Sequence, residues 1–178
     1  VFGEDPYAEF QSDIKTVDYK PNNTTDLDLI KRLKADGIPV VAVFLSGRPL
    51  WVNREINASD AFVAAWLPGS EGGGVADVLL RDAKGKVAHD FRGKLPYSWP
   101  RNAVQTALNA GQPNYNPQFP YGYGLGYGNK SDLPPLDEDP GVDLSAGQSD
   151  RFFERGARVA LQAVGTLASE QLEQQHPE

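Results

Sequence analysis

The sequence predicts an α/β fold, a three-layer sandwich in which a mostly parallel sheet lies between layers of helices. Residues 40–45 and 61–66 are short, continuously apolar runs, which are typical of strands buried on both faces. Helical patterns alternate with these runs along the chain, and this alternation favours parallel strands joined by helices. The 178 residues suffice for one domain with a sizeable core.

The first elements follow from apolar spacing and from the residues that begin and end helices. Phe2 and Gly3 are expected to end a strand that leads into a turn. A helix is predicted over residues 25–36, capped by Thr24 or Thr25 and ended by Gly37. Three of its residues recur at helical spacing: Leu27, Ile30 and Leu33.

After the first predicted strand, 40–45, residues 50–52 form a further short apolar element, and the run 61–66 is expected to be a second inner strand. A helix is predicted over residues 74–81, behind a glycine-rich loop. The carboxyl ends of such strands are where ligands gather in open α/β sheets.

The chain changes character beyond the second helix. Residues 84–130 are rich in Pro, Asn, Gly and Tyr, which predicts ordered loops and short edge strands around the sheet. The domain is expected to span residues 1–130, and the Pro-rich, acidic stretch 131–148 is interpreted as a linker. Residues 149–178 are predicted to form a C-terminal helical extension.

Composition removes several classes of function. Seventeen Lys and Arg face 24 Asp and Glu without a basic run, so nucleic acid is not an expected partner. No apolar run of membrane-spanning length occurs, so no membrane partner is expected. Cys is absent and the two histidines, His89 and His176, are far apart, so we predict neither a metal site nor a cofactor.

Five segments follow one another in an order and spacing that carry a family resemblance: residues 3–9, 45–50, 60–79, 93–95 with 98–100, and 119–125. Together they resemble the C-terminal α/β-sandwich domain of glycoside hydrolase family 3, which contains β-glucosidases and exo-1,3/1,4-β-glucanases. The resemblance covers about residues 1–128. It implies that the first strands of the domain precede Gly3, so that the sheet is incomplete at its N-terminus.

The resemblance also implies an activity and a division of labour. In this family an upstream (β/α)8 barrel supplies an aspartate nucleophile, and the second domain supplies a glutamate that acts as general acid and base. Carried over by position, that glutamate is Glu9 in the segment Gly-Glu-Asp-Pro-Tyr-Ala-Glu, with Glu4 as the alternative. The implied partners are the barrel and a β-glucan or cello-oligosaccharide substrate. The implied location is periplasmic or extracellular, and this chain alone is expected to be inactive.

The sequence departs from the family pattern at the loop and at the C-terminus. Ser12 stands before Asp13 where the family usually has Gly, and residues after about 130 match no part of the shared domain. Asp13 is interpreted either as orienting the loop or as ordinary turn chemistry.

Other conspicuous residues have a structural interpretation and a functional one. Arg48 is expected to pair with an acid near the core rather than to bind sugar. The glycine-rich stretch 69–74 lacks the Lys-Ser/Thr ending of a phosphate-binding loop. The three tryptophans are expected to pack in the core, with sugar stacking as the alternative: Trp51, Trp66 and Trp99.

Two functions compete with the glycosidase hypothesis. One is a non-catalytic α/β module that binds carbohydrate or protein, which would lack an upstream barrel with a nucleophilic aspartate. The other is a flavodoxin-like domain that binds phosphate or a nucleotide, and the order of the five segments disfavours it.

Overall fold

The computed structural model describes residues 1–5, 14–131 and 133–142. In this part of the chain, strands β1 (Phe2–Gly3), β2 (Val41–Leu45) and β3 (Ala61–Ala64) form a parallel sheet in the order β1-β2-β3. Phe2 pairs with Phe44, and Val43 pairs with Val63. The predicted parallel α/β architecture is therefore confirmed.

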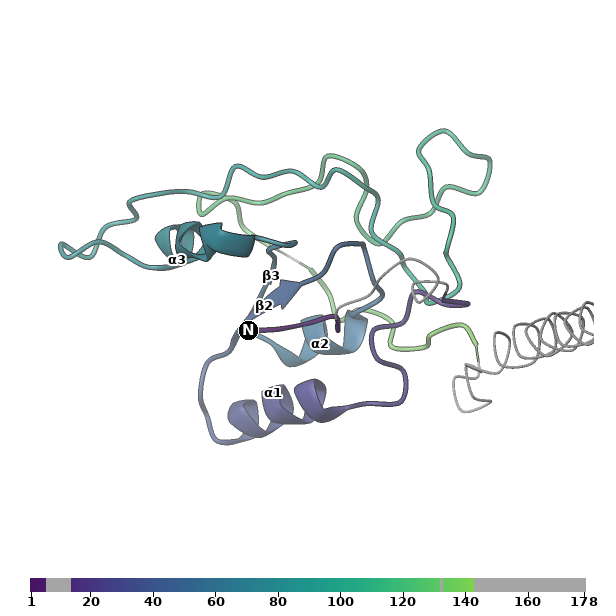
Figure 1. The fold of residues 1–178 in the computed structure, drawn as a ribbon, viewed down its shortest axis with the longest axis horizontal. Coiled ribbons are helices and arrows are strands. Elements are labelled where there is room, and N and C mark those ends of the chain that lie inside the picture. The colour runs from purple at the N-terminus through teal and green to yellow at the C-terminus, as the bar shows by residue number, and fades with distance from the viewer. Residues whose placement is uncertain (6–13, 132, 143–178) are drawn as a thin grey trace, which may run out of the picture. The chain divides into compact units, whose positions relative to one another are not determined.

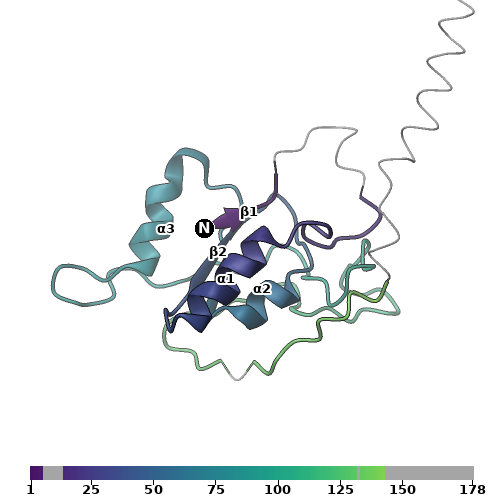
Figure 2. The same ribbon diagram turned by 90° about the horizontal axis from the view of Figure 1, so that it is seen from below.

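Helices lie on both sides of this sheet. Helix α1 (Thr25–Ala35) follows β1 and precedes β2, and α2 (Asn53–Ala58) connects β2 to β3. The strand order β1-β2-β3 means that the chain moves across the sheet in one direction through both strand–helix–strand connections. Because such connections are right-handed, α1 and α2 lie on the same face of the sheet (Figures 1 and 2). After β3, the 3₁₀ helix Gly69–Glu71 leads into α3 (Gly72–Leu79), which lies on the other side (Figure 1).

Helix α1 forms where its spacing predicted it, with Leu27 and Ile30 buried. The predicted cap by a threonine side chain does not form. The Thr24 hydroxyl donates to the Asp28 carboxylate at 2.8 Å and does not bond the helix backbone. The side-chain oxygen of Asn23 instead accepts from the backbone N–H of Thr25, at 3.0 Å. Gly37 ends the helix with φ +74°, as predicted.

Residues 50–52, expected only to be a short apolar element, contribute an isolated parallel bridge between Trp51 and Asp18. One expectation about the sheet needs correction. Strand β3 is an edge strand within the described residues rather than an inner one, and its residues are exposed or half-buried. Helix α2 was not predicted, because it is short and buries polar residues, Asn53 and Glu55.

The core lies between the sheet and the loops that follow α3. Its buried residues come from separate segments of the chain: Tyr19, Phe44, Leu50, Val52 and Trp99. The ring of Trp99 lies 6.4 Å from that of Phe44 and 6.5 Å from that of Phe62, and half-buried Leu95 and Phe119 pack beside it. The prediction that residues 84–130 wrap the sheet as ordered loops agrees with these contacts. The short edge strands expected there do not form, because this described stretch makes only isolated bridges such as that of Trp99 with Phe119.

The described residues of the predicted linker pack against α2. Leu136 is buried, and its backbone carbonyl and N–H both bond the Asn57 side chain, at 2.9 and 2.8 Å. Asn53 donates to the carbonyl of Asp137 at 2.8 Å. The domain boundaries themselves stay a prediction, and the helical extension expected over residues 149–178 lies outside the described residues.

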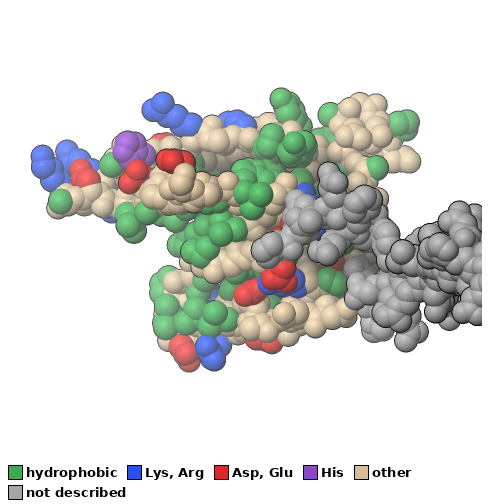
Figure 3. All heavy atoms as spheres, in the orientation of Figure 1, with side chains coloured by type: hydrophobic (Ala, Val, Ile, Leu, Met, Phe, Trp, Pro, Cys, Tyr) green, Lys and Arg blue, Asp and Glu red, His purple; other side chains and the backbone are tan. Residues whose placement is uncertain are grey.

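The described surface carries mixed charge. On the face drawn in Figure 3, basic and acidic side chains are interspersed among apolar and neutral ones. Within the described ranges, no helix is both long enough and apolar enough to cross a membrane.

Candidate active site

The candidate site lies at the carboxyl edge of the sheet, where the three parallel strands end. Strand β1 is followed by Glu4, β2 by Ser46 and β3 by Trp66, two residues after it ends. Ligand sites of open α/β sheets form at this edge. Glu9, the predicted acid/base residue, lies outside the described residues, and so does Asp13.

The alternative residue, Glu4, is held by hydrogen bonds on both of its carboxylate oxygens. Its Oε1 accepts from Nε of Arg48 at 2.7 Å and also from Nη2 of the same guanidinium. Its Oε2 lies 2.9 Å from the hydroxyl of Ser46. The Glu4 side chain is 13% exposed and that of Arg48 is 24% exposed, so the pair is largely shielded from water. The expectation that Arg48 pairs with an acid is therefore confirmed.

Ser46 stabilises the turn that contains Arg48. Ser46 is 2% exposed, and its hydroxyl lies 2.8 Å from the carbonyl of Arg48 and 3.2 Å from the backbone N–H of Arg48. The hydroxyl has one proton, so at any moment it donates either to the Glu4 carboxylate or to the Arg48 carbonyl. The serine thus connects the glutamate to the backbone that carries the arginine.

Gly3 allows β1 to approach the end of β2 closely. A Cβ atom at this position would lie 2.5 Å from the carbonyl oxygen of Leu45 and 2.8 Å from its Cβ. The next residue, Glu4, donates its backbone N–H to the same carbonyl at 2.9 Å. A side chain at position 3 would therefore displace the strand end from which Glu4 projects.

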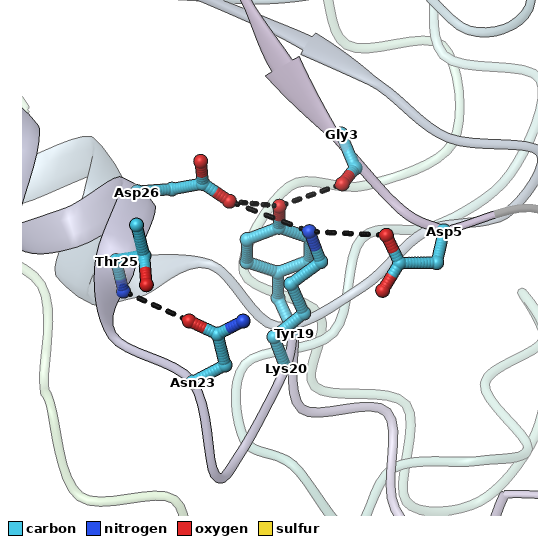
Figure 4. A network of polar contacts seen from close by, with 7 residues as sticks. All are labelled: Gly3, Asp5, Tyr19, Lys20, Asn23, Thr25 and Asp26. Carbon is cyan, nitrogen blue, oxygen red and sulfur yellow. Dashed lines mark hydrogen bonds and ion pairs between the residues drawn. The ribbon is translucent and has the colours of Figure 1, made fainter.

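A second polar network, drawn in Figure 4, ties this strand end to the start of α1. The Tyr19 hydroxyl lies 2.7 Å from the carbonyl of Gly3 and 2.7 Å from the Asp26 carboxylate. Burial, together with the hydrogen bond to Asp26, raises the pKa of Tyr19 well above its usual range. The Lys20 ammonium nitrogen lies 3.4 Å from a carboxylate oxygen of Asp5 and 3.5 Å from one of Asp26. The Asp5 side chain is 83% exposed, so its ion pair with Lys20 is open to water.

The chain that follows residue 13 is anchored in the core. Val17 donates its N–H to the carbonyl of Ala103 at 2.7 Å and accepts from the N–H of Trp51 at 2.6 Å. Tyr19 donates its N–H to the carbonyl of Trp51 at 3.2 Å. Val17 and Tyr19 are therefore held by backbone hydrogen bonds to Trp51, and Val17 also to Ala103.

Trp66 packs against the core, with its ring 6.0 Å from that of Trp99, but it is less buried than the other two tryptophans. Trp51 and Trp99 are 0% and 2% exposed, which confirms core packing for both, whereas Trp66 is only half-buried. Its φ of +55° is unusual for a bulky residue, and its ring lies 6.3 Å from that of Tyr97. Its carbonyl accepts from the N–H of Ser46 at 3.2 Å, which joins the ends of β2 and β3.

A buried charged cluster at the start of α2 was not found from the sequence. The Asp18 side chain is 0% exposed and bonds Arg54 at 2.8 Å, and burial raises the pKa of Asp18 to about 6. Glu55 is 3% exposed, and burial raises its pKa to about 7. One oxygen of each carboxylate has no protein hydrogen-bond partner. Neither acid lies in a motif, so the sequence offered no signal for them.

The glycine-rich stretch does not resemble a phosphate cradle in its local structure. It forms the 3₁₀ helix and the first turn of α3, and its glycines face open space. Gly69 has φ +53° and supplies the bend after Pro68.

Comparisons with known proteins identify the family. The sequence model of the Glycosyl hydrolase family 3 C-terminal domain matches residues 1–127. A crystal structure of an exo-1,3/1,4-beta-glucanase from a Pseudoalteromonas species is 58% identical, with a TM-score of 0.75 over 77% of this chain and 17% of that one.

Relatives found by sequence include glucosidases and a xylosidase. A periplasmic beta-glucosidase of Salmonella typhimurium is 39% identical over 56% of this chain and 15% of its own. A lysosomal beta glucosidase of Dictyostelium discoideum is 33% identical over 71% of this chain and 15% of its own. A xylan 1,4-beta-xylosidase of Xylanibacter ruminicola is 36% identical over 56% of this chain and 12% of its own.

The chain thus spans 12–17% of the length of these relatives. The family match, over residues 1–127, includes the strands, the carboxyl edge and the wrapping loops. By these matches the chain belongs to glycoside hydrolase family 3, and residues 1–127 match that family's C-terminal domain.

Proposed function

We propose that this chain supplies the general acid/base residue of a retaining, exo-acting β-glucosidase or β-glucanase, and that Glu9 is that residue. One observation supports Glu9 over Glu4. Both oxygens of Glu4 are engaged, one by the Arg48 guanidinium and the other by the Ser46 hydroxyl. A general acid must instead point at the leaving oxygen of the substrate, within hydrogen-bond reach.

The chemistry needs two carboxyl groups about 5 Å apart. An aspartate on an upstream barrel domain attacks the anomeric carbon while the Glu9 carboxylic acid protonates the departing oxygen. In the second step the Glu9 carboxylate removes a proton from water, which attacks the covalent glycosyl-enzyme and releases the sugar with its configuration retained. Because the nucleophile belongs to another domain, the 178-residue chain is expected to be inactive by itself.

A β-glucan or a cello-oligosaccharide is the proposed substrate. The matched exo-1,3/1,4-beta-glucanase is 58% identical, whereas the xylosidase from Xylanibacter ruminicola is 36% identical, so glucosides are favoured over xylosides. The likeness to a periplasmic beta-glucosidase supports a periplasmic or extracellular location.

Azide rescue in the whole protein tests the assignment. Glu9→Ala should hydrolyse cellobiose far more slowly than wild type and a nitrophenyl β-glucoside only moderately more slowly, because nitrophenolate departs without a proton. Azide needs no deprotonation, so it should restore turnover of the aryl glucoside and give a β-glucosyl azide.

Glu4→Ala is the matched comparison. It should show no azide product, because the Glu9 carboxylate would remain and repel the anion. If Glu4→Ala is rescued and Glu9→Ala behaves as wild type, the two residues have been assigned the wrong way round. A whole protein that binds cello-oligosaccharides without cleaving them would instead support the non-catalytic binding module.

A further inference from the structure

We propose that the exposed ring of Tyr97, held in place by Trp66, is a stacking platform for a glucosyl unit of the departing sugar chain, at the carboxyl edge of the sheet. The inference deepens the proposed function and rests on it, because it takes a β-glucan as the substrate. It assigns to Tyr97 a part in binding the sugar chain that is separate from the carboxyl groups that break the bond.

Tyr97 is an exposed aromatic residue next to the core. It is 60% exposed, whereas Trp99, two residues later, is 2% exposed and belongs to the core. The ring of Tyr97 meets that of Trp66 in a perpendicular contact, with centroids 6.3 Å apart and an angle of 74° between the planes. Such a contact sets the angle of the Tyr97 ring and covers at most one of its two faces. A flat apolar surface therefore stays open to a ligand.

The backbone on both sides of Tyr97 is fixed by hydrogen bonds. Leu95 donates its N–H to the carbonyl of Tyr123 at 2.8 Å, and Trp99 donates its N–H to the carbonyl of Phe119 at 2.8 Å. The ring is thus positioned before a ligand arrives, and this lowers the entropy that binding would cost.

Trp66 connects this ring to the candidate active site. Its carbonyl accepts from the backbone N–H of Ser46 at 3.2 Å, and the Ser46 hydroxyl lies 2.9 Å from the Glu4 carboxylate. Two hydrogen bonds therefore lead from Trp66 to the end of β1. Trp66 also keeps a φ of +55°, and strained backbone of this kind clusters at ligand-binding sites. The Tyr97 ring accordingly lies at the edge of the sheet where α/β folds bind ligands.

A β-glucosyl unit has an apolar face that matches an aromatic ring. Its hydroxyl groups are equatorial and point outward, while its axial C–H groups lie on the two faces of the sugar ring. A tyrosine side chain offers a rigid apolar area and loses little conformational entropy when it is covered. Because the ring carries no positive charge to attract an anion, a neutral sugar fits it better than a phosphorylated or acidic ligand.

The exposure of Tyr97 indicates which part of the substrate it meets. An exo-acting enzyme holds one terminal sugar at the bond to be broken, in a site from which water is largely excluded. A residue that is 60% exposed does not suit that enclosed position. The remainder of the chain extends outward on the leaving-group side, and Tyr97 stacks on a glucosyl unit there.

The test measures the binding of a thio-linked cellotriose, whose sulfur bridges resist hydrolysis, to the whole protein. Tyr97→Ala should raise its Kd by on the order of tenfold, the size of one lost aromatic contact. Tyr97→Phe keeps the ring and should bind as wild type does. The inhibition constant of glucose should be unchanged in both variants, because a single sugar occupies only the terminal position.

Tyr127→Ala is the matched control. Tyr127 is 49% exposed and packs against Phe91, and its hydroxyl donates to the carbonyl of Val78 in the last turn of α3. Its loss should leave the Kd unchanged. Tyr97→Leu, which keeps apolar bulk without a flat ring, should show the loss of affinity if Tyr97→Ala does not fold. Circular dichroism spectra identify the variants that fold.

An unchanged Kd in folded Tyr97→Ala and Tyr97→Leu, or an equal loss in Tyr127→Ala, would overturn the inference. Equal weakening of glucose and of thio-linked cellotriose would overturn it too, because that pattern reports general damage to the site. If wild type hydrolyses glucosides but binds thio-linked cellotriose no more tightly than glucose, the platform fails and the proposed function stands. If Glu9→Ala fails the azide test while Tyr97→Ala still loses affinity selectively, the acid/base assignment fails and the platform stands.

Discussion

Glu55 should make the protein less stable as the pH rises, and Glu55→Gln should remove that loss. The side chain is 3% exposed at the start of α2, where burial raises its pKa from 4.5 to about 7. Arg54 opposes this shift, while the Asp18 and Glu138 carboxylates add to it. The folded state therefore keeps a proton that the unfolded chain has already released.

The sign and size follow from proton linkage. Between pH 4.5 and about 7 the folded state binds more protons than the unfolded state, so the free energy of unfolding falls as the pH rises and is constant above that window. At about 1.4 kcal/mol for each pKa unit, the loss is on the order of 3 kcal/mol. Glutamine has the same shape and no charge, so the variant should recover most of this at alkaline pH.

The measurement is urea unfolding followed by tryptophan fluorescence, because Trp51 and Trp99 are buried in the core. Glu55→Gln should be more stable than wild type at about pH 8.5 and nearly equal to it at about pH 4.5. Glu71→Gln, the same change at an exposed position, should alter the unfolding midpoint little at either pH.

A stability difference between Glu55→Gln and wild type that is the same at both pH values would refute the reasoning, because it would show that ionisation of Glu55 is not involved. Some pH dependence should survive in the variant. Asp18 is also buried, its pKa is raised from 3.8 to about 6, and it contributes a loss of the same sign at lower pH.

Two further predictions concern the edges of the sheet. Gly3→Ala should destabilise the protein by about 1–3 kcal/mol in urea unfolding, because the new methyl group meets Leu45. Gly74→Ala, which faces open space in α3, should instead be neutral or stabilising, and equal effects would contradict the steric argument. At the amino edge, the hydrogen bond from Lys34 holds the pKa of Asp60 below 3.8, so its contribution is present above that pH and is lost on acidification. Wild type and Asp60→Asn should therefore converge in thermal midpoint as the pH falls below 3.8, and a constant difference would exclude this pair as the cause.

Local sequence patterns were sufficient to predict the helix and the strand whose apolar residues follow a regular spacing or a continuous run. The buried run at 40–45 became β2, and the spacing of Leu27 and Ile30 predicted α1 and its buried face. Helix α2 escaped prediction, since Asn53 and Glu55 place polar atoms where an amphipathic pattern needs apolar ones. Its stability comes from tertiary contacts, such as the bond from Asn53 to Asp137, which no local window contains.

The sequence predicted that Arg48 at the candidate site pairs with an acid, but not which acid. Arg48 after a buried strand indicated an arginine paired with an acid, and this was confirmed. That the acid is Glu4, 44 residues earlier, depends on the parallel register that brings the ends of β1 and β2 together. The contact of Tyr19 with Gly3 depends on the same register, and nothing in the spacing of these residues indicates it.

The departures from ordinary folding rules gather at one edge of the sheet. Positive φ angles at Lys20 and Trp66 lie there, the first beside the tyrosine that bonds Gly3 and the second just past β3. Helix α2 starts at the same edge because it runs back along the strands, so Glu55 and Asp18 also lie toward it. The amino edge, by contrast, has the ordinary exposed pair of Lys34 with Asp60. Backbone strain and buried acids with an unbonded oxygen are features that cluster at functional sites. On these physical grounds, which do not depend on the family resemblance, we infer that the carboxyl edge of the sheet is the functional one.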